Sequence, residues 1–210
     1  MRTIVIASPK GGTGKSTLTG HLAVEAERQE SGPVAIVDTD PQGTLADWWN
    51  ARQAPTPLFA AVDTAQLPSR LEALREHGIE LVLIDTPPAF TQTTHRTLAV
   101  ADLVVVPVRP SPHDLRAVGT VIEVVEQQGK PFVFVVNAAI PRTRIALDAV
   151  RALAQHGKVA PATLHNRIDF ATSMVDGRTA RELNEKSRSS GEVAELWTYV
   201  NSQLRKNVRR

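Results

Sequence analysis

Five short apolar runs, separated by segments long enough for helices, constrain the fold of this chain more than any other feature. Each run is rich in Val, Ile or Leu and is apolar on both faces of a strand. The runs are Thr3–Ser8, Val34–Asp38, Glu80–Asp85, Leu103–Val108 and Phe132–Asn137. Strands of this kind are buried on both sides, as in parallel sheets covered by helices. The sequence therefore predicts an α/β fold: a mostly parallel twisted sheet with helices on both faces.

The segments between the runs carry apolar residues at helical spacing. We expect helices over residues 15–30, 43–52, 66–77, 91–99, 112–128 and 145–155. Gly78, Gly129 and Gly157 each follow one of these segments, at the place where a left-handed glycine commonly ends a helix. After Gly157 the pattern predicts one short strand, 159–164, followed by helices only.

The last expected helix, about 191–206, carries one apolar stripe. Its members are Val193, Leu196, Trp197, Val200 and Leu204. Such a stripe normally packs on a core, and no Pro-, Gly- or Ser-rich linker divides the chain. We therefore predict one domain over residues 1–210, with a C-terminal helical part, about 165–208, packed on the same core.

Composition excludes several kinds of chemistry. The 210 residues include no cysteine, so disulfides, cysteine zinc sites and thiol catalysis are excluded. No apolar window reaches the ~18 residues that a membrane-spanning helix needs, and we expect a cytoplasmic protein. Residues 1–105 carry 8 Lys and Arg against 12 Asp and Glu (net −4), whereas residues 106–210 carry 16 against 10 (net +6). This asymmetry indicates either a surface that meets a polyanion or a solvated basic face.

A glycine-rich segment follows the first expected strand. Gly11, Gly12 and Gly14 lie between that strand and a helix that begins near Lys15. Glycines let the backbone approach phosphate oxygens closely, and the free amides at the helix start attract anions. A strand, this loop and a helix in that order predict a nucleotide-binding site.

The residues at the end of the loop suit a nucleoside triphosphate. Lys15 would reach the β- and γ-phosphates, and the hydroxyl of Ser16 would bind Mg²⁺. Thr17, next in the chain, would lie near the α-phosphate. The cofactors that we expect are therefore ATP or ADP and Mg²⁺.

Two of the apolar strands end in an aspartate, Asp38 and Asp85. The carboxyl ends of parallel strands meet at one edge of the sheet, where the loop also lies. We expect Asp85 to hold Mg²⁺ through water, and Asp38 could do the same from the neighbouring strand. Asp40 would face the same way and could orient the attacking water. The alternative role for any one strand-end aspartate is to cap a helix.

Three segments resemble motifs of the ParA/MinD-type ATPases. Their deviant Walker A loop is matched by Lys10-Gly11-Gly12-Thr13-Gly14-Lys15-Ser16. Their switch I is matched by Asp38-Thr39-Asp40-Pro41-Gln42, and their Walker B and switch II by Leu83-Ile84-Asp85-Thr86-Pro87-Pro88. The resemblance spans nearly the whole chain, whose length is similar to that of small ParA proteins. It implies a P-loop NTPase fold.

The resemblance also implies an activity. It predicts a weak ATPase that hydrolyses ATP to ADP and phosphate, with Lys10, Lys15 and Asp40 in the catalytic machinery. In this family the additional lysine, here Lys10, crosses the interface of an ATP-sandwich homodimer and contacts the partner's phosphates. A lysine from each subunit would offset the repulsion between two facing triphosphates.

Contacts to adenine are implied at two places. Asn137 ends a strand where relatives use Asn for the edge of the base. Pro110, Ser111 and Pro112 form a rigid segment at another strand end near the same cleft. A strand-end Asn that caps a turn is the alternative for Asn137.

The resemblance further implies that the dimer binds DNA without sequence preference. Phosphate contacts need only basic residues, and the candidates in the second half are Arg144, Arg167, Lys186 and Arg188. The implied role is to segregate a plasmid or chromosome, or to position a cargo, on the nucleoid. A ParB-like, centromere-binding or cargo-adaptor protein would stimulate hydrolysis.

Two alternatives remain open. A MinD-like positioning ATPase at a membrane is suggested by the C-terminal apolar stripe and the basic residues after it, but the chain does not end in a strongly apolar tail. The basic residues are Arg205, Lys206, Arg209 and Arg210. A metabolic P-loop enzyme would need an acceptor site, and His113 and His165 are the only strand-end histidines that could suggest one.

Overall fold

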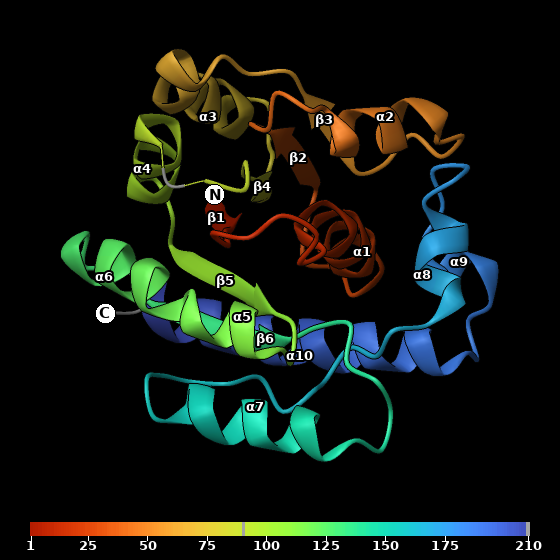
Figure 1. Ribbon diagram of the computed structural model, residues 1–210. Helices are drawn as coiled ribbons and strands as arrows, with labels where there is room; N and C mark the ends of the chain where they lie inside the picture. The colour runs from red at the N-terminus through yellow and green to blue at the C-terminus, as the bar shows by residue number, and fades with distance from the viewer. Residues whose placement is uncertain (90, 209–210) are drawn as a thin grey trace.

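The computed structural model describes residues 1–89 and 91–208, so Arg209 and Arg210 lie outside the described residues (Figure 1). The described part forms one six-stranded sheet in the order β3-β2-β4-β1-β5-β6. Every hydrogen-bonded pair of neighbouring strands is parallel. The strands are β1 (Arg2–Ile6), β2 (Val34–Asp38), β3 (Leu58–Ala60), β4 (Leu81–Asp85), β5 (Leu103–Val108) and β6 (Phe132–Val136). The predicted α/β fold is confirmed.

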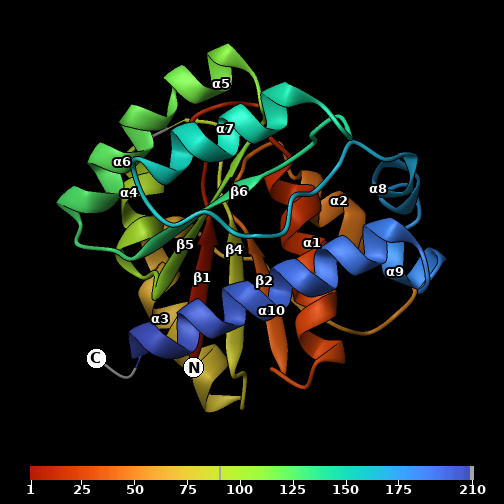
Figure 2. The same cartoon turned by 90° about the horizontal axis from the view of Figure 1, so that it is seen from below.

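Helices cover both faces of this sheet (Figure 2). One face packs against α1 and α10 in a cluster that includes Ile4, Leu22 and Trp197. The other face packs against α3, α4 and α6 around Val5, Leu98 and Val121. The helices are α1 (Lys15–Arg28), α2 (Thr44–Ala51), the 3₁₀ turn η1 (Thr64–Gln66), α3 (Leu67–Glu76), α4 (Gln92–Ala99), α5 (Pro112–Arg116), α6 (Val118–Gln127), α7 (Arg144–Ala154), α8 (Ile168–Ser173), α9 (Ala180–Leu183) and α10 (Arg188–Val208).

Two sequence expectations about the elements are wrong, and one strand was not expected. The segment 112–128 forms two helices, α5 and α6, that meet at Ala117. The expected strand 159–164 has a single isolated bridge, Val159 with Phe134, and a second bridge, Ala139 with His165, lies just after it. Pro161 lies between these bridges and has no N–H to donate to a ladder. β3 was not expected, because three residues are too few for a pattern to show.

Gly157 also differs from the expectation. Gly78 and Gly129 are left-handed, with φ of 83° and 62°, but Gly157 is not among the described glycines with a positive φ. A Cβ built at Gly157 would lie 2.9 Å from Cε2 of Phe132. Close packing against an aromatic ring, rather than backbone conformation, is what requires glycine there.

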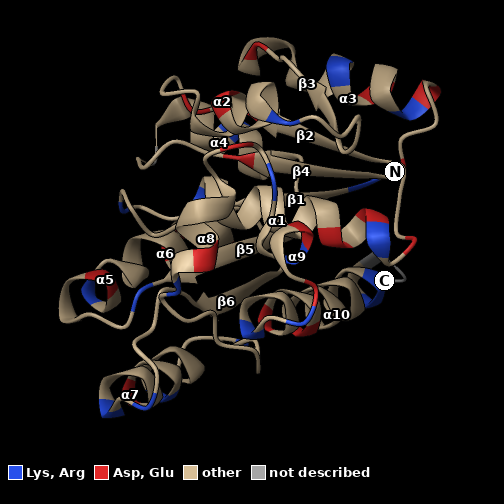
Figure 3. Ribbon diagram, turned by 90° about the vertical axis from the view of Figure 1, so that its right-hand side faces the viewer, with Lys and Arg blue, Asp and Glu red and all other residues tan. Residues whose placement is uncertain are grey.

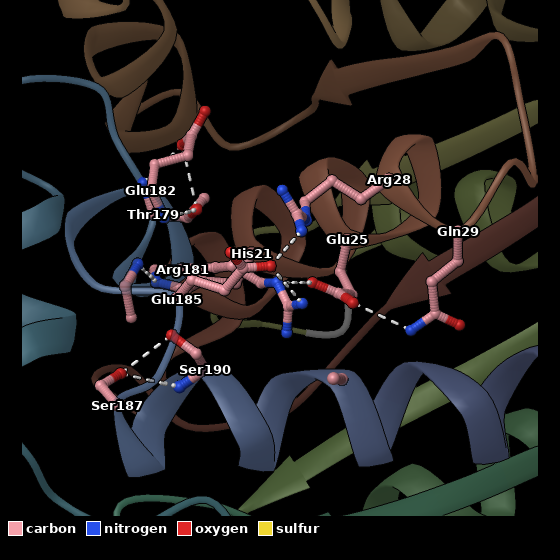
Figure 4. Close-up of polar contacts among 12 residues, drawn as sticks. His21, Glu25, Arg28, Gln29, Thr179, Arg181, Glu182, Glu185, Ser187 and Ser190 are labelled. Atoms are coloured by element: carbon pink, nitrogen blue, oxygen red, sulfur yellow. Dashed lines mark hydrogen bonds and ion pairs between the residues drawn. The ribbon is translucent and has the colours of Figure 1, made fainter.

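The C-terminal segment is fixed to α1 by apolar packing and by the polar contacts drawn in Figure 4. The apolar stripe of α10 is buried in the same cluster as β1. Between α1 and α9, Glu25 is 3% exposed and its Oε2 lies 3.6 Å from Nε of Arg181. Arg28 and Arg181 both pair with Glu185, at 2.7 and 3.0 Å. The helix that starts at the glycine-rich loop is therefore tied to the end of the chain.

His21 connects these two parts at full burial. Its Nδ1 lies 2.8 Å from the carbonyl oxygen of Thr17, and its Nε2 lies 3.0 Å from the amide nitrogen of Ala180. A carbonyl only accepts and an amide only donates, so the ring carries its hydrogen on Nδ1. Burial lowers the pKa of His21 from 6.5 to about 4. The imidazole is therefore neutral at physiological pH.

No helix within residues 1–89 and 91–208 is long and apolar enough to cross a membrane.

Candidate functional site

The glycine-rich loop connects β1 to α1 at the carboxyl edge of the sheet. Gly12 and Gly14 adopt left-handed conformations, with φ of 71° and 87°. A Cβ at Gly14 would lie only 2.4 Å from Nδ2 of Asn137, so no larger residue fits there. Gly14 caps α1 without a side-chain hydrogen bond, and the first turn of α1 carries no acid. The free amides of this turn are therefore available to an anion.

The two lysines of the loop lie in different environments. Lys15 is 7% exposed, and its Nζ donates to the carbonyl oxygen of Lys10 at 3.3 Å. Burial lowers the pKa of Lys15, while Asp85 and Asp40 oppose that shift. The side chain of Lys10 is exposed and makes no ion pair or hydrogen bond with any described residue. One ammonium group thus faces into the loop and the other faces outward.

Ser16 and Asp85 form a pair of oxygen ligands beneath the loop. Oγ of Ser16 donates to Oδ2 of Asp85 at 2.5 Å, and Asp85 is completely buried. Burial raises the pKa of Asp85 to about 7, against the hydrogen bond from Ser16. A hydroxyl and a carboxylate are hard oxygen donors of the type that Mg²⁺ binds, so both residues fit the expected cation.

These two residues would not hold a metal ion by themselves. Among the described residues, no group of three or more His, Cys, Asp or Glu is arranged to bind one. Mg²⁺ in nucleotide sites commonly completes its octahedron with substrate phosphates and water. The ligands present here therefore suit a cation that arrives with a nucleotide.

Asp38 fills the helix-capping role that the sequence left open as an alternative. Its Oδ2 accepts hydrogen bonds from the amides of Leu45 and Ala46, each at 3.1 Å, and its Oδ1 accepts from the amide of Asp40 at 2.9 Å. Burial raises its pKa, and these hydrogen bonds oppose the shift. Both carboxylate oxygens cap α2 and shape the preceding loop. The contact with Mg²⁺ expected at Asp38 stays a prediction.

The loop after β2 is also tied to β4 and to the C-terminal segment. The hydroxyl of Thr39 donates to the carbonyl oxygen of Asp85 at 2.6 Å. At the other end of α2, the guanidinium of Arg52 donates to both carboxylate oxygens of Glu182, at 2.6 and 2.9 Å, with its side chain only 3% exposed. α2 is therefore held at both ends, and the loop that carries Asp40 has a defined path.

A cavity of about 270 Å³ lies above the glycine-rich loop. Asp40 lies on its wall, and Oδ1 of Asp40 accepts from the amide of Gln42 at 3.0 Å. Sequence reasoning did not assign Gln42, Thr44 or Pro88 to the site. Gln42 belongs to the segment that matches switch I, and this match could have identified it as a site residue. The lining residues are Gly11, Gly12, Gly14, Lys15, Ser16, Thr17, Asp40, Gln42, Thr44 and Pro88.

A second cavity, of about 340 Å³, adjoins the first across Gly14 and Thr17. It is largely apolar at its base, and its volume and lining suit a planar heterocycle. The lining residues are Gly14, Thr17, Leu18, His21, Asn137, Ala138, Leu164, His165, Asn166, Arg167, Phe170, Ala171 and Met174. A nucleotide with its phosphates in the first cavity would place its base in the second.

Asn137 is in the second cavity, as expected, and also holds the loop. Its Nδ2 donates to the carbonyl oxygen of Thr13 at 2.7 Å. The hydroxyl of Thr13 in turn lies 3.4 Å from the carbonyl oxygen of Lys10. Asn137 therefore links the base cavity to the conformation of the phosphate loop, a role that the sequence did not indicate.

Pro110, Ser111 and Pro112 are not among the residues that line the base cavity. Ser111 instead caps α5: its Oγ accepts from the amide of Asp114 at 3.1 Å. Asp114 shares a small hollow with Lys10, on the other side of the loop. The predicted adenine contacts of Pro110, Ser111 and Pro112 therefore stay predictions that this cavity does not support. Asn137 is joined in the cavity by residues of the segment 164–174.

Lys and Arg positions lie on several elements, α7 and α10 among them (Figure 3). The four basic residues expected to contact DNA come from three parts of the fold. Arg144 begins α7, with its side chain 91% exposed and 3.6 Å from Asp148. Lys186, just before α10, and Arg188, its first residue, are both exposed. Arg167 lines the base cavity, and its guanidinium pairs with Glu192 at 2.6 Å, beside His165. A paired, largely buried arginine is a weaker candidate for DNA than the other three.

Comparison with known proteins agrees with this geometry. Residues 4–180 match the family described as "CobQ/CobB/MinD/ParA nucleotide binding domain". The chain belongs to this family. The ParA/MinD-type assignment that the loop and aspartate motifs predicted is confirmed.

Relatives in this family are named for different roles. The chain is 27% identical to "Maintenance of carboxysome distribution protein A" of Halothiobacillus neapolitanus, over 90% of this chain and 91% of that protein. It is 31% identical to "Chromosome-partitioning ATPase Soj" of Thermus thermophilus, over 98% of this chain and 83% of the relative. The septum site-determining protein MinD of Pyrococcus horikoshii, complexed with Mg-ADP, matches with a TM-score of 0.79 at 17% identity, over 98% of both chains. This last likeness shows the fold.

Proposed function

We propose that the protein is a partition or cargo-positioning ATPase, which binds ATP with Mg²⁺, forms an ATP-sandwich homodimer and associates with DNA without sequence preference. The observation that carries the proposal is the pair of lysines in one loop. Lys15 is buried beside the phosphate cavity, whereas Lys10 is exposed and makes no ion pair within residues 1–89 and 91–208. Lys10 is therefore free to reach a second nucleotide.

The residues divide the chemistry among them. Lys15 and the amides of the loop bind the phosphates, Ser16 and Asp85 hold Mg²⁺, and Asp40 orients the attacking water. Mg²⁺ supplies positive charge to the phosphate oxygens when it is bound. Lys10 of each subunit neutralises the partner's nucleotide, so that ATP favours the dimer. Hydrolysis to ADP and phosphate removes the terminal charge and releases the dimer.

The relatives indicate only the general kind of cargo. Relatives are named for carboxysome distribution and for chromosome partitioning, and we propose that this protein performs such a role through an ATP-dependent switch that a partner can reset. We propose a ParB-like or cargo-adaptor protein as that partner, and the nucleoid as the place where the dimer acts. Exposed basic residues, Arg144, Lys186 and Arg188, support contacts to DNA phosphates.

A MinD-like membrane role is less well supported. It would need the apolar stripe of α10 at the surface, but Val193, Leu196, Trp197, Val200 and Leu204 are each at most 2% exposed. The described part of α10 uses this stripe for the core, and none of it is left to enter a lipid surface.

Retention on DNA tests the proposal. Immobilised DNA of arbitrary sequence should retain the protein with ATP and Mg²⁺ but not with ADP, and retention should fall steeply as salt increases, since phosphate contacts release counterions. Retention that is equal with ATP and ADP and insensitive to salt would contradict the proposal.

A further inference from the structure

The end of β5 brings an arginine to the glycine-rich loop. β5 pairs with β1, with Ile6 opposite Val105, so the residues that follow both strands emerge side by side. Arg109 is the first residue after β5, and its side chain is 45% exposed. Its Nη1 lies 3.9 Å from the position of a Cβ on Gly12, which lines the phosphate cavity. The guanidinium therefore lies beside the loop at Gly12, although Arg109 itself is not among the residues that line the cavity.

One side of this guanidinium is oriented by a buried acid. Nε of Arg109 lies 3.6 Å from Oδ1 of Asp114, which is too far for a hydrogen bond but close enough for an ion pair. Asp114 is 6% exposed, and Oδ1 has no hydrogen-bond partner among the described residues. Its other oxygen is hydrogen-bonded to the hydroxyl of Ser111. Asp114 is thus a fixed charge with one free oxygen that faces Arg109.

The rest of the guanidinium has no partner. Within residues 1–89 and 91–208, no residue makes a hydrogen bond to the side chain of Arg109. Asp114 is the one acid of these residues that lies within 4.0 Å of it. Nε faces Asp114 while Nη1 faces the loop, so the two Nη groups remain available. A planar fork of donors matches two oxygens of a phosphate better than an ammonium does.

We propose that Arg109 is a third cation of the phosphate site: it binds the terminal phosphate of the ATP held in its own loop, and Asp114 is its positioning residue. This inference rests on the proposed function, because it requires that ATP occupies the cavity above the loop. Lys15 contacts the phosphates from inside the loop, whereas Lys10 is exposed and does not line the phosphate cavity. Arg109 approaches from the β5 side, where it distinguishes a triphosphate from a diphosphate.

Binding of nucleotides to dilute monomer tests this role. Competition against a fluorescent nucleotide would give the affinities for ADP and for the non-hydrolysable analogue AMPPNP, each with Mg²⁺. Arg109→Gln should weaken AMPPNP about tenfold or more, as expected for loss of a hydrogen bond to a charged group, and should leave the affinity for ADP unchanged. Arg109→Lys should fall between wild type and Arg109→Gln, because it keeps the charge but loses the fork.

Arg116 provides a matched control. It lies on α5, is exposed, and makes no ion pair with any described residue. Arg116→Gln removes the same charge a short distance away and should leave the affinity for AMPPNP unchanged. Equal AMPPNP affinity in Arg109→Gln and Arg116→Gln would overturn the proposal. Equal loss of ADP affinity in Arg109→Gln would also overturn it, since the effect would then not concern the terminal phosphate.

The role of Asp114 is tested by a double-mutant cycle. Asp114→Asn should weaken AMPPNP less than Arg109→Gln does, and the double variant should be no weaker than Arg109→Gln alone. Additive losses, or a loss of ADP affinity in Asp114→Asn, would mean that Asp114 acts only on the stability of α5. If wild type bound neither nucleotide, the proposed function would fail. If wild type bound both and Arg109→Gln behaved like it, only the inference about Arg109 would fail.

Discussion

His21 makes the stability of the fold depend on pH in a way that the structure specifies. The folded protein holds the imidazole neutral, with a pKa of about 4, whereas its ordinary value is 6.5. As pH falls below 6.5, the unfolded chain binds a proton on His21, whereas the folded chain does not bind it until the pH approaches 4. The stabilisation is therefore complete above pH 6.5 and is lost progressively as pH falls toward 4.

The size of the effect follows from these two pKa values. The full difference corresponds to about 3.4 kcal/mol, since each pKa unit is about 1.36 kcal/mol. At pH 5 the unfolded chain is mostly protonated at this position and the folded chain is mostly not, which costs about 2 kcal/mol relative to pH 8. A loss of this size is a large fraction of the stability of an ordinary domain.

Urea unfolding of wild type and His21→Gln at pH 8 and pH 5 measures this effect. Tryptophan fluorescence is a suitable signal, because Trp48 and Trp197 are buried. His21→Gln should be less stable than wild type at pH 8, because it loses the rigid imidazole ring that packs on Phe170, with 5.1 Å between the ring centroids, and holds its two nitrogens toward Thr17 and Ala180. The difference between the two proteins in the free energy of unfolding should be about 2 kcal/mol smaller at pH 5 than at pH 8. Other titrating groups, Asp85 among them, are present in both proteins and cancel.

A gap that stays constant between pH 8 and pH 5 would refute the reasoning. It would mean that His21 takes up its proton equally in the folded and unfolded chain. The imidazole would then not be a neutral bridge between α1 and α9.

Three further predictions concern the nucleotide site. Asp40→Ala should bind ATP and accumulate as a dimer while release of phosphate stops, since water is no longer oriented; normal turnover would contradict this role. Asp38→Ala should lower the free energy of unfolding in urea by about 1 kcal/mol through loss of the α2 cap, and unchanged stability would reject the capping role. Gly14→Ala should destabilise the fold more than Gly78→Ala, because both glycines are left-handed but only Gly14 would collide with Asn137. Equal losses of stability in the two glycine variants would show that the contact with Asn137 has no cost.

The parallel sheet and the phosphate loop could be predicted because their signals are local. An apolar run that is buried on both faces identifies its strand wherever the partner strands lie. Gly14 adopts a left-handed conformation and Lys15 begins the helix. A short segment of sequence is enough to show both the glycine and the start of the helix. This is why the first β–loop–helix unit was identified from its own sequence.

The two strand-end aspartates illustrate the limit of local patterns. Asp38 and Asp85 both end an apolar strand in adjacent positions of the sheet. They differ because the chain after Asp38 returns to place the amides of Leu45 and Ala46 on its carboxylate. Asp85 is met instead by Ser16, 69 residues away in the sequence. Spacing within one segment could not assign the helix cap to Asp38 and the contact with Ser16 to Asp85.

One wall of the second cavity, residues 164–174, was missed for a similar reason. A bridge between Ala139 and His165 and the backbone hydrogen bonds around it bring this wall beside the loop. No periodicity marks such a bridge. Pro110–Pro112 had the clearer strand-end position, but this segment leads into α5, where Ser111 caps the helix by accepting from the amide of Asp114. The sequence identified the edge of the sheet at which the site lies. The three-dimensional path of the chain was needed to show which segments line each side of the loop.

The mass of the protein in solution tests the central claim most directly. Size-exclusion chromatography with light scattering should give a mass near 22.8 kDa with ADP and twice that mass with ATP and Mg²⁺ in the non-hydrolysing Asp40→Ala variant. Adding Lys10→Ala to that variant should return the ATP-bound protein to the lower mass while ATP remains bound. A mass that does not respond to ATP, or a dimer that persists without the Lys10 ammonium, would contradict the account.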